Sequence, residues 1–232
     1  MADASAVNRA YFNKLAPEYD AKFHKARAVM ERQVRGNAAF IGAREGGRML
    51  DYACGTGFLS AALGDRLSQC VGIDVSESMV EAYNARARSE GFTPEQRTAH
   101  VGNLLDPSDP RPRALSTPNL GGFDVAGVGA GFHHFDDCHL AASRLAQRLR
   151  PGGVLLVLDF VAHAAGAVDD AAVRGVRHHG FVEDEVRRIF EGAGVGRGFA
   201  FREMDEELVF EGAGEGRGDM VRRVFLARGE KA

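Results

Sequence analysis

The spacing of hydrophobic residues along this chain changes near residue 48. Residues 2–43 have helical spacing, and Pro17 is expected to start a second helical segment within them. From Arg48 onward, short apolar runs alternate with helical segments, a pattern typical of parallel strands joined by crossover helices. The pattern predicts strands at 48–54, 69–75, 96–102 and 123–129, with helices from residue 58, at 76–90 and at 136–149.

The last third of the chain continues this alternation and then departs from it. Pro151 and the two glycines after it predict a turn that ends the preceding helix. The proline-rich stretch 107–118 predicts an irregular surface loop. Two late strand-like runs are expected to pair as an antiparallel hairpin that closes the sheet. The further predicted elements are a strand at 154–160, a helix near 181–192 and the two strand-like runs at 198–210 and 222–228.

Composition limits the class of protein. A length of 232 residues with 45% hydrophobic residues allows one substantial core, so a single domain over residues 1–232 is expected. The net charge of −3 with scattered Lys and Arg forms no basic stripe, so nucleic acid is not an expected partner. Every apolar run is shorter than the ~18–20 residues of a membrane span, so no membrane is expected as a partner either. The chain is expected to be a monomer or a homodimer.

Cysteine usage bears on compartment and on metals. An odd number of cysteines without C-x-x-C spacing argues against a disulfide framework and against a zinc site. A reducing compartment fits best, so a cytoplasmic location is expected. No metal site is predicted. The three cysteines are Cys54, Cys70 and Cys138.

A glycine hinge follows the first predicted strand. Gly55 and Gly57 allow a tight turn and close approach of a ligand to the backbone. Loops that bind dinucleotides read G-x-G-x-x-G, but here Ser60 stands at the third glycine position and Asp51 precedes the hinge. An acid at this place suits the ammonium group of S-adenosylmethionine. Asp74, at the end of the second strand, is placed to accept hydrogen bonds from both ribose hydroxyls, but the same placement occurs in NAD enzymes.

Two segments carry a family resemblance. Residues 49–60 resemble motif I of the class I S-adenosylmethionine-dependent methyltransferases, and residues 16–20 resemble the A-x-x-Y-D segment of small-molecule methyltransferases related to the ubiquinone-biosynthesis enzymes. The resemblance implies an α/β, Rossmann-like sheet of seven strands with the last pair antiparallel. It also implies an N-terminal helical lid over residues 1–43, a cofactor-binding core over residues 44–232, and S-adenosyl-L-methionine as the cofactor.

The resemblance further implies a set of cofactor contacts. Tyr19 is expected near the methionine end of the cofactor. Asn103 stands where the family commonly has an aspartate that contacts the adenine amino group, and its side-chain carbonyl can accept from the same amine. The expected cofactor-binding residues are Tyr19, Asp51, Ala53, Gly55, Gly57, Asp74, Val75, Met79, Asn103 and Leu104.

Candidate catalytic residues follow the fourth and fifth strands. His133 and His134 come after the fourth strand and Asp159 lies near the end of the fifth, so these side chains should meet at one edge of the sheet. An Asp beside a His fixes the ring tautomer and stabilises the imidazolium. We expect His133, oriented by Asp159, to act as the base, with His134 as its substitute because a register error of one residue exchanges their faces. Neighbouring histidines on a strand point to opposite faces and therefore do not suit one metal ion. His178 and His179 are expected in the segment that walls the acceptor pocket.

These features predict methyl transfer to a small-molecule acceptor, most readily at a hydroxyl oxygen, with His/Asp assistance. The His-His-Phe segment at 133–135 resembles small-molecule methyltransferases that act on hydroxylated rings, quinols or sugars. A thiol or a ring carbon stays open as the acceptor atom. Two other classes also stay open, an NAD-dependent oxidoreductase and a non-catalytic methyltransferase-like binding module.

Overall fold

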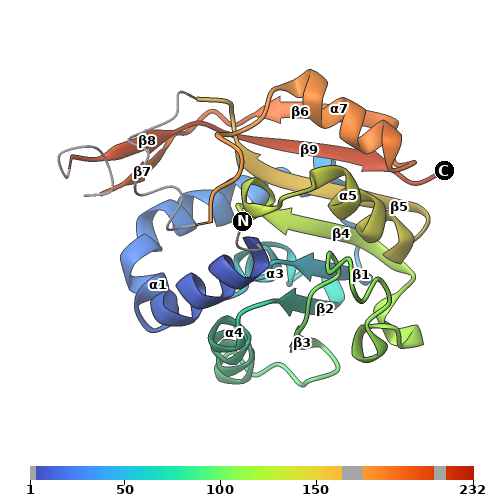
Figure 1. The fold of residues 1–232 in the computed structure, drawn as a ribbon, viewed down its shortest axis with the longest axis horizontal. Helices are drawn as coiled ribbons and strands as arrows, with labels where there is room; N and C mark the ends of the chain where they lie inside the picture. The colour runs from blue at the N-terminus through green and yellow to red at the C-terminus, as the bar shows by residue number, and fades with distance from the viewer. Residues whose placement is uncertain (1–3, 164–174, 212–217) are drawn as a thin grey trace.

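The computed structural model describes residues 4–163, 175–211 and 218–232. Its centre is a seven-stranded sheet with the order β3-β2-β1-β4-β5-β9-β6. Strands β1 to β5 pair in parallel, whereas β9 is antiparallel to both β5 and β6 (Figure 1). The predicted Rossmann-like sheet with an antiparallel end is therefore confirmed. The strands are β1 (Gly47–Tyr52), β2 (Leu67–Asp74), β3 (Arg97–Val101), β4 (Phe123–Gly129), β5 (Leu149–Phe160), β6 (Arg197–Glu203) and β9 (Val224–Glu230).

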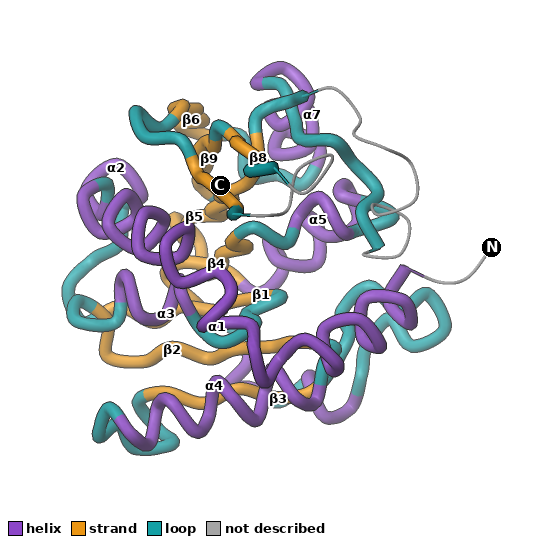
Figure 2. The backbone as a smooth tube through the Cα atoms, turned by 90° about the vertical axis from the view of Figure 1, so that its left-hand side faces the viewer, coloured by secondary structure: helices purple, strands orange, loops and turns teal. Residues whose placement is uncertain are grey.

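Helices cover both faces of this sheet. Because side chains alternate along a strand, Met49 and Leu50 of β1 belong to opposite hydrophobic cores. The core that contains Leu50 is closed by α5 and α7, and the core that contains Met49 by the second half of α1 together with α2 and α3 (Figure 2). The helices are α1 (Ala4–Gly36), α2 (Ala38–Ile41), α3 (Phe58–Leu63), α4 (Glu77–Ser89), α5 (Cys138–Arg148) and α7 (Glu183–Gly192).

The N-terminal region differs from its prediction. Pro17 does not start a new helix but lies inside α1, which runs for 33 residues. The break lies at Phe23, whose φ of −111° and ψ of 16° are not helical. Helix α1 lies beyond the carboxyl ends of β1 and β4, on the side to which the strand arrows point (Figure 1). Within the described residues, no helix combines the length and apolar character needed to cross a membrane.

The C-terminal strands also differ in detail. The run predicted at 198–210 divides into β6 and β7 (Leu208–Phe210), and β7 pairs with β8 (Met220–Arg222) in a separate two-stranded sheet beside α1 (Figure 1). The strand predicted at 154–160 begins earlier, at Leu149, so the Pro151 segment lies within β5, where the pairing with β4 shifts register. A bulge absorbs the residues that suggested a turn. The loop predicted at 107–118 is irregular, with the short 3-10 helices η1 (Arg113–Leu115) and η2 (Pro118–Leu120) in or beside it.

Candidate cofactor and acceptor site

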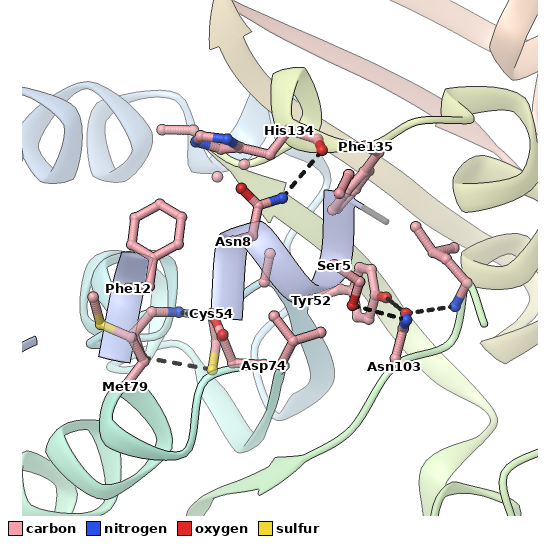
Figure 3. A pocket seen from close by; sticks show the side chains of 18 of the residues that line it. Ser5, Asn8, Phe12, Tyr52, Cys54, Asp74, Met79, Asn103, His134 and Phe135 are labelled. Carbon is pink, nitrogen blue, oxygen red and sulfur yellow. Dashed lines mark hydrogen bonds between the residues drawn. The ribbon is translucent and has the colours of Figure 1, made fainter. Parts of the chain in front are cut away.

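A cavity of about 390 Å³ lies where the parallel strands end. Its walls come from the segments after β1, β2, β3 and β4, and from α1, which crosses above them. In parallel α/β sheets, ligands bind at the carboxyl ends of the strands. Ser5 and Asn8 of α1 reach into the space between the His134 segment and Asn103 (Figure 3).

The glycine hinge forms the floor of this cavity. Gly55 has a φ of 51°, and its N–H donates to Oδ2 of Asp74 at 2.9 Å, which ties the hinge to the end of β2. Gly57, with a φ of 87°, does not line the cavity; a Cβ there would come within 2.7 Å of the Tyr83 ring. Gly57 therefore serves close packing against α4 rather than ligand contact. Ala53 lines the cavity, and its φ of 53° is unusual for a residue with a side chain.

Asp74 lies on the cavity wall, as its predicted ribose role requires. Its Oδ1 accepts from the Ser76 N–H and its Oδ2 from the Gly55 N–H, both at 2.9 Å. Each carboxylate oxygen keeps a further acceptor position. Burial raises the pKa of Asp74, against the effect of these two hydrogen bonds. Val75 and Met79 also line the cavity.

Asp51 does not line the cavity, which corrects the expectation that it faces the ammonium group of the cofactor. The side chain is 2% exposed, and its Oδ2 accepts from the backbone N–H of Ser60 at 3.2 Å and from the Ser60 hydroxyl at 2.8 Å. It thus stabilises the first turn of α3. Burial raises the pKa of Asp51 to about 7. The Ser60 hydroxyl also accepts from Tyr83 at 2.8 Å, so the residue at the third glycine position joins α3 to α4.

Asn103 lines the far end of the cavity after β3. Its Oδ1 accepts from the Leu105 N–H at 2.8 Å and from the Tyr52 hydroxyl at 3.2 Å, and its Nδ2 donates to the Ser5 hydroxyl at 3.1 Å (Figure 3). Leu104, predicted as a cofactor contact, is instead 3% exposed and belongs to the hydrophobic core, whereas Leu105 lines the cavity. Consecutive side chains of this segment point to different sides.

Arg27 of α1 lines the cavity and is not among the site residues predicted from the sequence. Its Nη1 donates at 2.6 Å to both Asp20 Oδ1 and Thr56 Oγ1, and its Nε donates at 2.6 Å to Glu31. Its Nη2 is buried and has no hydrogen-bond partner among the described residues. An unpaired buried donor is costly, so this position suits an anionic group. No signal in the sequence distinguishes Arg27 from the other basic residues of the same helix, since its place on the cavity wall comes with its tertiary contact to Thr56.

Aromatic side chains of α1 line the part of the cavity near the histidines. The Phe12 ring lies 5.3 Å from the His134 ring and 6.3 Å from the Tyr19 ring, and the Tyr19 ring lies 5.0 Å from that of Phe23. All four line the cavity. Burial raises the pKa of Tyr19 to about 12, so the phenol stays protonated at neutral pH.

The predicted pair of His133 and Asp159 forms. His133 Nδ1 lies 2.8 Å from Asp159 Oδ1, and the His133 backbone N–H donates to Oδ2 at 3.1 Å. The Phe160 N–H donates to the same carboxylate at 2.7 Å. Burial alone would raise the pKa of Asp159, but the His133 ring and these donors hold it below its usual value. Asp159 is therefore ionised and fixes the His133 ring.

His134, rather than His133, lines the cavity. The two residues lie in the short 3-10 helix η3 (Phe132–His134), and their ring centroids are 4.2 Å apart. His134 Nδ1 is 3.2 Å from the Gly175 carbonyl oxygen. Because a carbonyl only accepts, Nδ1 carries the hydrogen and Nε2 keeps a lone pair. Burial, and then the neighbouring His133, lower the pKa of His134 to about 3, so the ring is neutral at physiological pH.

The second histidine pair lies elsewhere. His178 Nε2 is 3.1 Å from the Phe135 carbonyl oxygen and 3.6 Å from Cys138 Sγ. The His179 ring packs 5.8 Å from that of His163. Neither His178 nor His179 lines the cavity, which corrects the expectation that they wall the acceptor pocket. In the described part of the chain, no group of three or more His, Cys, Asp or Glu side chains could hold a metal ion.

Comparison with known proteins identifies the family. A sequence model of a methyltransferase domain matches residues 23–195. The chain belongs to this methyltransferase family. An uncharacterized methyltransferase of Schizosaccharomyces pombe is 33% identical over 158 residues, which is 66% of this chain and 54% of that protein. The demethylmenaquinone methyltransferase of Thermus thermophilus is 30% identical over 159 residues, 67% of each chain. This methyltransferase chain spans about half the length of the yeast relative.

Solved structures agree with this family at the level of the fold. The magnesium protoporphyrin IX methyltransferase of Synechocystis, solved with bound S-adenosylhomocysteine, has a TM-score of 0.69 at 17% identity and covers 99% of this chain and 100% of its own. A [4+2]-cyclase has a TM-score of 0.67 at 17% identity, with 100% of this chain and 98% of its own covered. The predicted membership of the class I S-adenosylmethionine-dependent methyltransferases related to the quinone-biosynthesis enzymes is confirmed. Since the cyclase shares the fold, the reaction has to be argued from the site.

Proposed function

We propose that this methyltransferase transfers a methyl group from S-adenosylmethionine to a hydroxyl oxygen of an apolar, ring-bearing small molecule. The observation that carries the proposal is the division of one cavity into two parts. Asp74, Asn103 and Arg27 give one part hydrogen-bonding and charged groups. Aromatic rings and the neutral His134 line the other part.

The polar part fits the cofactor. The unpaired Nη2 of Arg27 would hold the carboxylate of the methionine moiety. Arg27 lies beside the glycine hinge, because its Nη1 donates to the hydroxyl of Thr56 in that hinge. Asp74 would accept from the ribose hydroxyls, and Asn103 lies where the adenine edge would end. When bound, the cofactor supplies a methyl group activated by its sulfonium. The residues of the chain then hold the acceptor oxygen in line with that methyl, where alignment supplies much of the rate.

The aromatic part fits an apolar ring. Phe12, Tyr19 and Phe23 place three rings along one wall, and aromatic side chains favour flat apolar partners in offset or edge-to-face contact. Relatives of this chain carry names that point the same way. These include the demethylmenaquinone methyltransferase of Thermus thermophilus and 2-phytyl-1,4-naphtoquinone methyltransferases of cyanobacteria, the first of which is 28% identical over 159 residues.

In this proposal His134 accepts the proton of the acceptor. Its Nε2 lone pair is free of the Gly175 contact, which uses Nδ1. A pKa of about 3 makes the ring a weak base, yet one strong enough to take the proton from the acceptor hydroxyl during methyl transfer. The reason is that the acceptor hydroxyl becomes strongly acidic as its oxygen gains the methyl group, so the proton moves to the ring within the transition state for methyl transfer. His133 and Asp159 act as positioning residues, because they fix the ring against which His134 packs.

The test uses labelled S-adenosylmethionine with a panel of acceptors that differ in one feature. A naphthoquinol, its mono-methyl ether and the corresponding hydrocarbon separate hydroxyl from ring recognition. We expect label in a methyl ether of the quinol. If no hydroxylated ring receives the label, although the chain binds S-adenosylhomocysteine in a separate titration, a binding module would be favoured over an enzyme.

Methylation of a ring carbon is the second candidate. One relative of this chain, from Shewanella halifaxensis, is named as a ubiquinone/menaquinone biosynthesis C-methyltransferase and is 32% identical over 123 residues. The same quinol reaction separates the two outcomes, because the methyl signal of an aryl ether and that of a ring methyl differ in the NMR spectrum. A ring methyl in the product would replace oxygen by carbon in the proposal.

A further inference from the structure

A second pocket, of about 280 Å³, lies on the surface between the loop that joins β3 to β4 and the last turns of α5. It shares no lining residue with the cofactor cavity. Three arginines line it, and its lining residues include no aspartate or glutamate. Arg111 comes from the loop, and Arg144 and Arg148 come from successive turns of one face of α5.

The charges of these arginines are not neutralised by the protein. Among the described residues, Arg111 and Arg144 form no ion pair and donate no hydrogen bond, and Arg144 Nε is buried without a partner. Arg148 donates through Nη1 to the carbonyl oxygens of Leu115 and Leu120, the latter at 2.8 Å. Burial lowers the pKa of Arg148, and the charge of Arg144 lowers it further. Like charges thus converge on one pocket, an arrangement that an anion would stabilise.

We propose that this pocket binds a phosphate group of a small molecule. A phosphate monoester carries close to two negative charges and three strong acceptor oxygens, whereas a carboxylate carries one charge and two oxygens. The planar guanidinium of arginine matches phosphate geometry. Thr117 and Gln147 also line the pocket and supply neutral donors, whereas the Ser116 hydroxyl donates to the Pro112 carbonyl oxygen at 2.8 Å. Three guanidinium groups with these donors match the larger anion better than the smaller one.

The arginine pocket is separate from the cofactor cavity. Leu140 of α5 lines the cofactor cavity, and Arg144 follows one turn later on the same face of the helix, away from that cavity. Likewise, Asn103 and Leu105 line the cofactor cavity while Leu104, between them, lines the arginine pocket. The two sites are therefore neighbours on shared elements, and each can be titrated while the other is monitored.

The experiment is a calorimetric titration of the whole chain with inorganic phosphate, pyrophosphate and glycerol 3-phosphate at constant ionic strength. The wild-type chain should bind phosphate or pyrophosphate, and Arg144→Gln should weaken that binding ~10- to 100-fold, as loss of a charge-assisted hydrogen bond predicts. Tighter binding of glycerol 3-phosphate than of pyrophosphate would assign the phosphate to an ester, and the reverse would assign it to a free anion. Arg113→Gln is the matched control, because Arg113 is exposed in the same loop, changes the net charge equally and does not line the pocket.

Three results would overturn the proposal. They are no heat of binding for any phosphate probe at millimolar concentration, equal losses in Arg144→Gln and Arg113→Gln, and tighter binding of citrate than of pyrophosphate. Arg111→Gln is the second variant if Arg144→Gln fails to fold. Unchanged affinity for S-adenosylhomocysteine shows that each variant is folded, and keeps this test separate from that of the methyl transfer.

Discussion

The polar and aromatic parts of the cavity are built in different ways. The polar part takes Asp74 and Asn103 from the ends of adjacent strands, where the Gly55 N–H holds Asp74 in place, and Arg27 from α1. The aromatic part rests on α1 and η3, whose contacts join residues more than a hundred positions apart, as when Asn8 Nδ2 donates to the His134 carbonyl oxygen at 3.3 Å. In the proposed function, acceptor binding therefore depends on how one long helix lies across the sheet, and cofactor binding on the strand ends together with Arg27 of that helix.

The largest expected effect lies in the aromatic part. His134→Ala should lower turnover about 10²- to 10⁴-fold, because a proton acceptor in the cavity is lost. Affinity for S-adenosylhomocysteine should stay within twofold of wild type, about the scatter of such measurements. His133→Ala should have a smaller effect, since that ring does not line the cavity. Steady-state kinetics measures both variants, with His178→Ala as a control from the neighbouring segment that also lies outside the cavity. Equal turnover in His134→Ala and wild type would remove proton transfer from the proposal.

The next prediction distinguishes the two acids beside the glycine hinge. The pKa of Asp51 is raised to about 7 in the folded chain, so the folded state binds a proton that the unfolded state releases near pH 4. The stability from this proton is fully present below about pH 4 and is lost as pH rises toward 7, by at most about 4 kcal/mol. Asp51→Asn should flatten the dependence of the free energy of unfolding on pH between 4 and 7. Denaturant titrations at several pH values measure it, and parallel curves for the two proteins would contradict it.

Asp74, unlike Asp51, lines the cavity. Asp74→Ala should weaken S-adenosylhomocysteine binding by ~10- to 100-fold, because the carboxylate on the cavity wall no longer accepts from the ribose hydroxyls. Calorimetry measures this loss, with Asp109→Ala as an exposed control outside the cavity. Unchanged affinity in Asp74→Ala would remove the ribose assignment.

These differences explain how far the sequence could predict the site. Asp74 and Gly55 follow directly from strand-end positions, since the order of strands and the glycine hinge are local signals. Asp51 has the same local signal, yet its carboxylate turns toward Ser60 because a buried acid takes the nearest donors. Whether an acid faces a ligand or a helix end depends on side-chain packing, which spacing does not encode.

The N-terminal region shows a different limit. In the first part of α1, apolar Ala10 is exposed, whereas polar Asn8 is buried against the His134 segment. A helix that lines a cavity carries polar and aromatic residues on its inner side, so hydrophobic spacing does not identify that side. For the same reason Arg27 could not be distinguished from its basic neighbours.

The smallest expected effect concerns the proposed lid. The kink at Phe23 divides α1, and its first part covers the cavity. We expect residues 9–25 to exchange backbone hydrogens more slowly once S-adenosylhomocysteine is bound, because closure of a lid over a ligand orders it. Hydrogen exchange with and without the ligand is the measurement, with α7 as an internal reference remote from the cavity. Equal exchange of residues 9–25 in both states would count against a lid.

The most direct test of the central claim, that the polar part of this cavity holds the cofactor, is one calorimetric comparison at Arg27. Wild type and Arg27→Met are titrated with S-adenosylhomocysteine and with 5′-methylthioadenosine, which lacks the amino-acid carboxylate. Arg32→Met is the control, because Arg32 lies on the same helix and pairs with Glu206 instead of lining the cavity. We predict that Arg27→Met weakens S-adenosylhomocysteine binding by ~10- to 100-fold and leaves 5′-methylthioadenosine binding unchanged, as loss of one charge-assisted pair requires. Equal losses for both ligands, or no loss for either, would contradict the account.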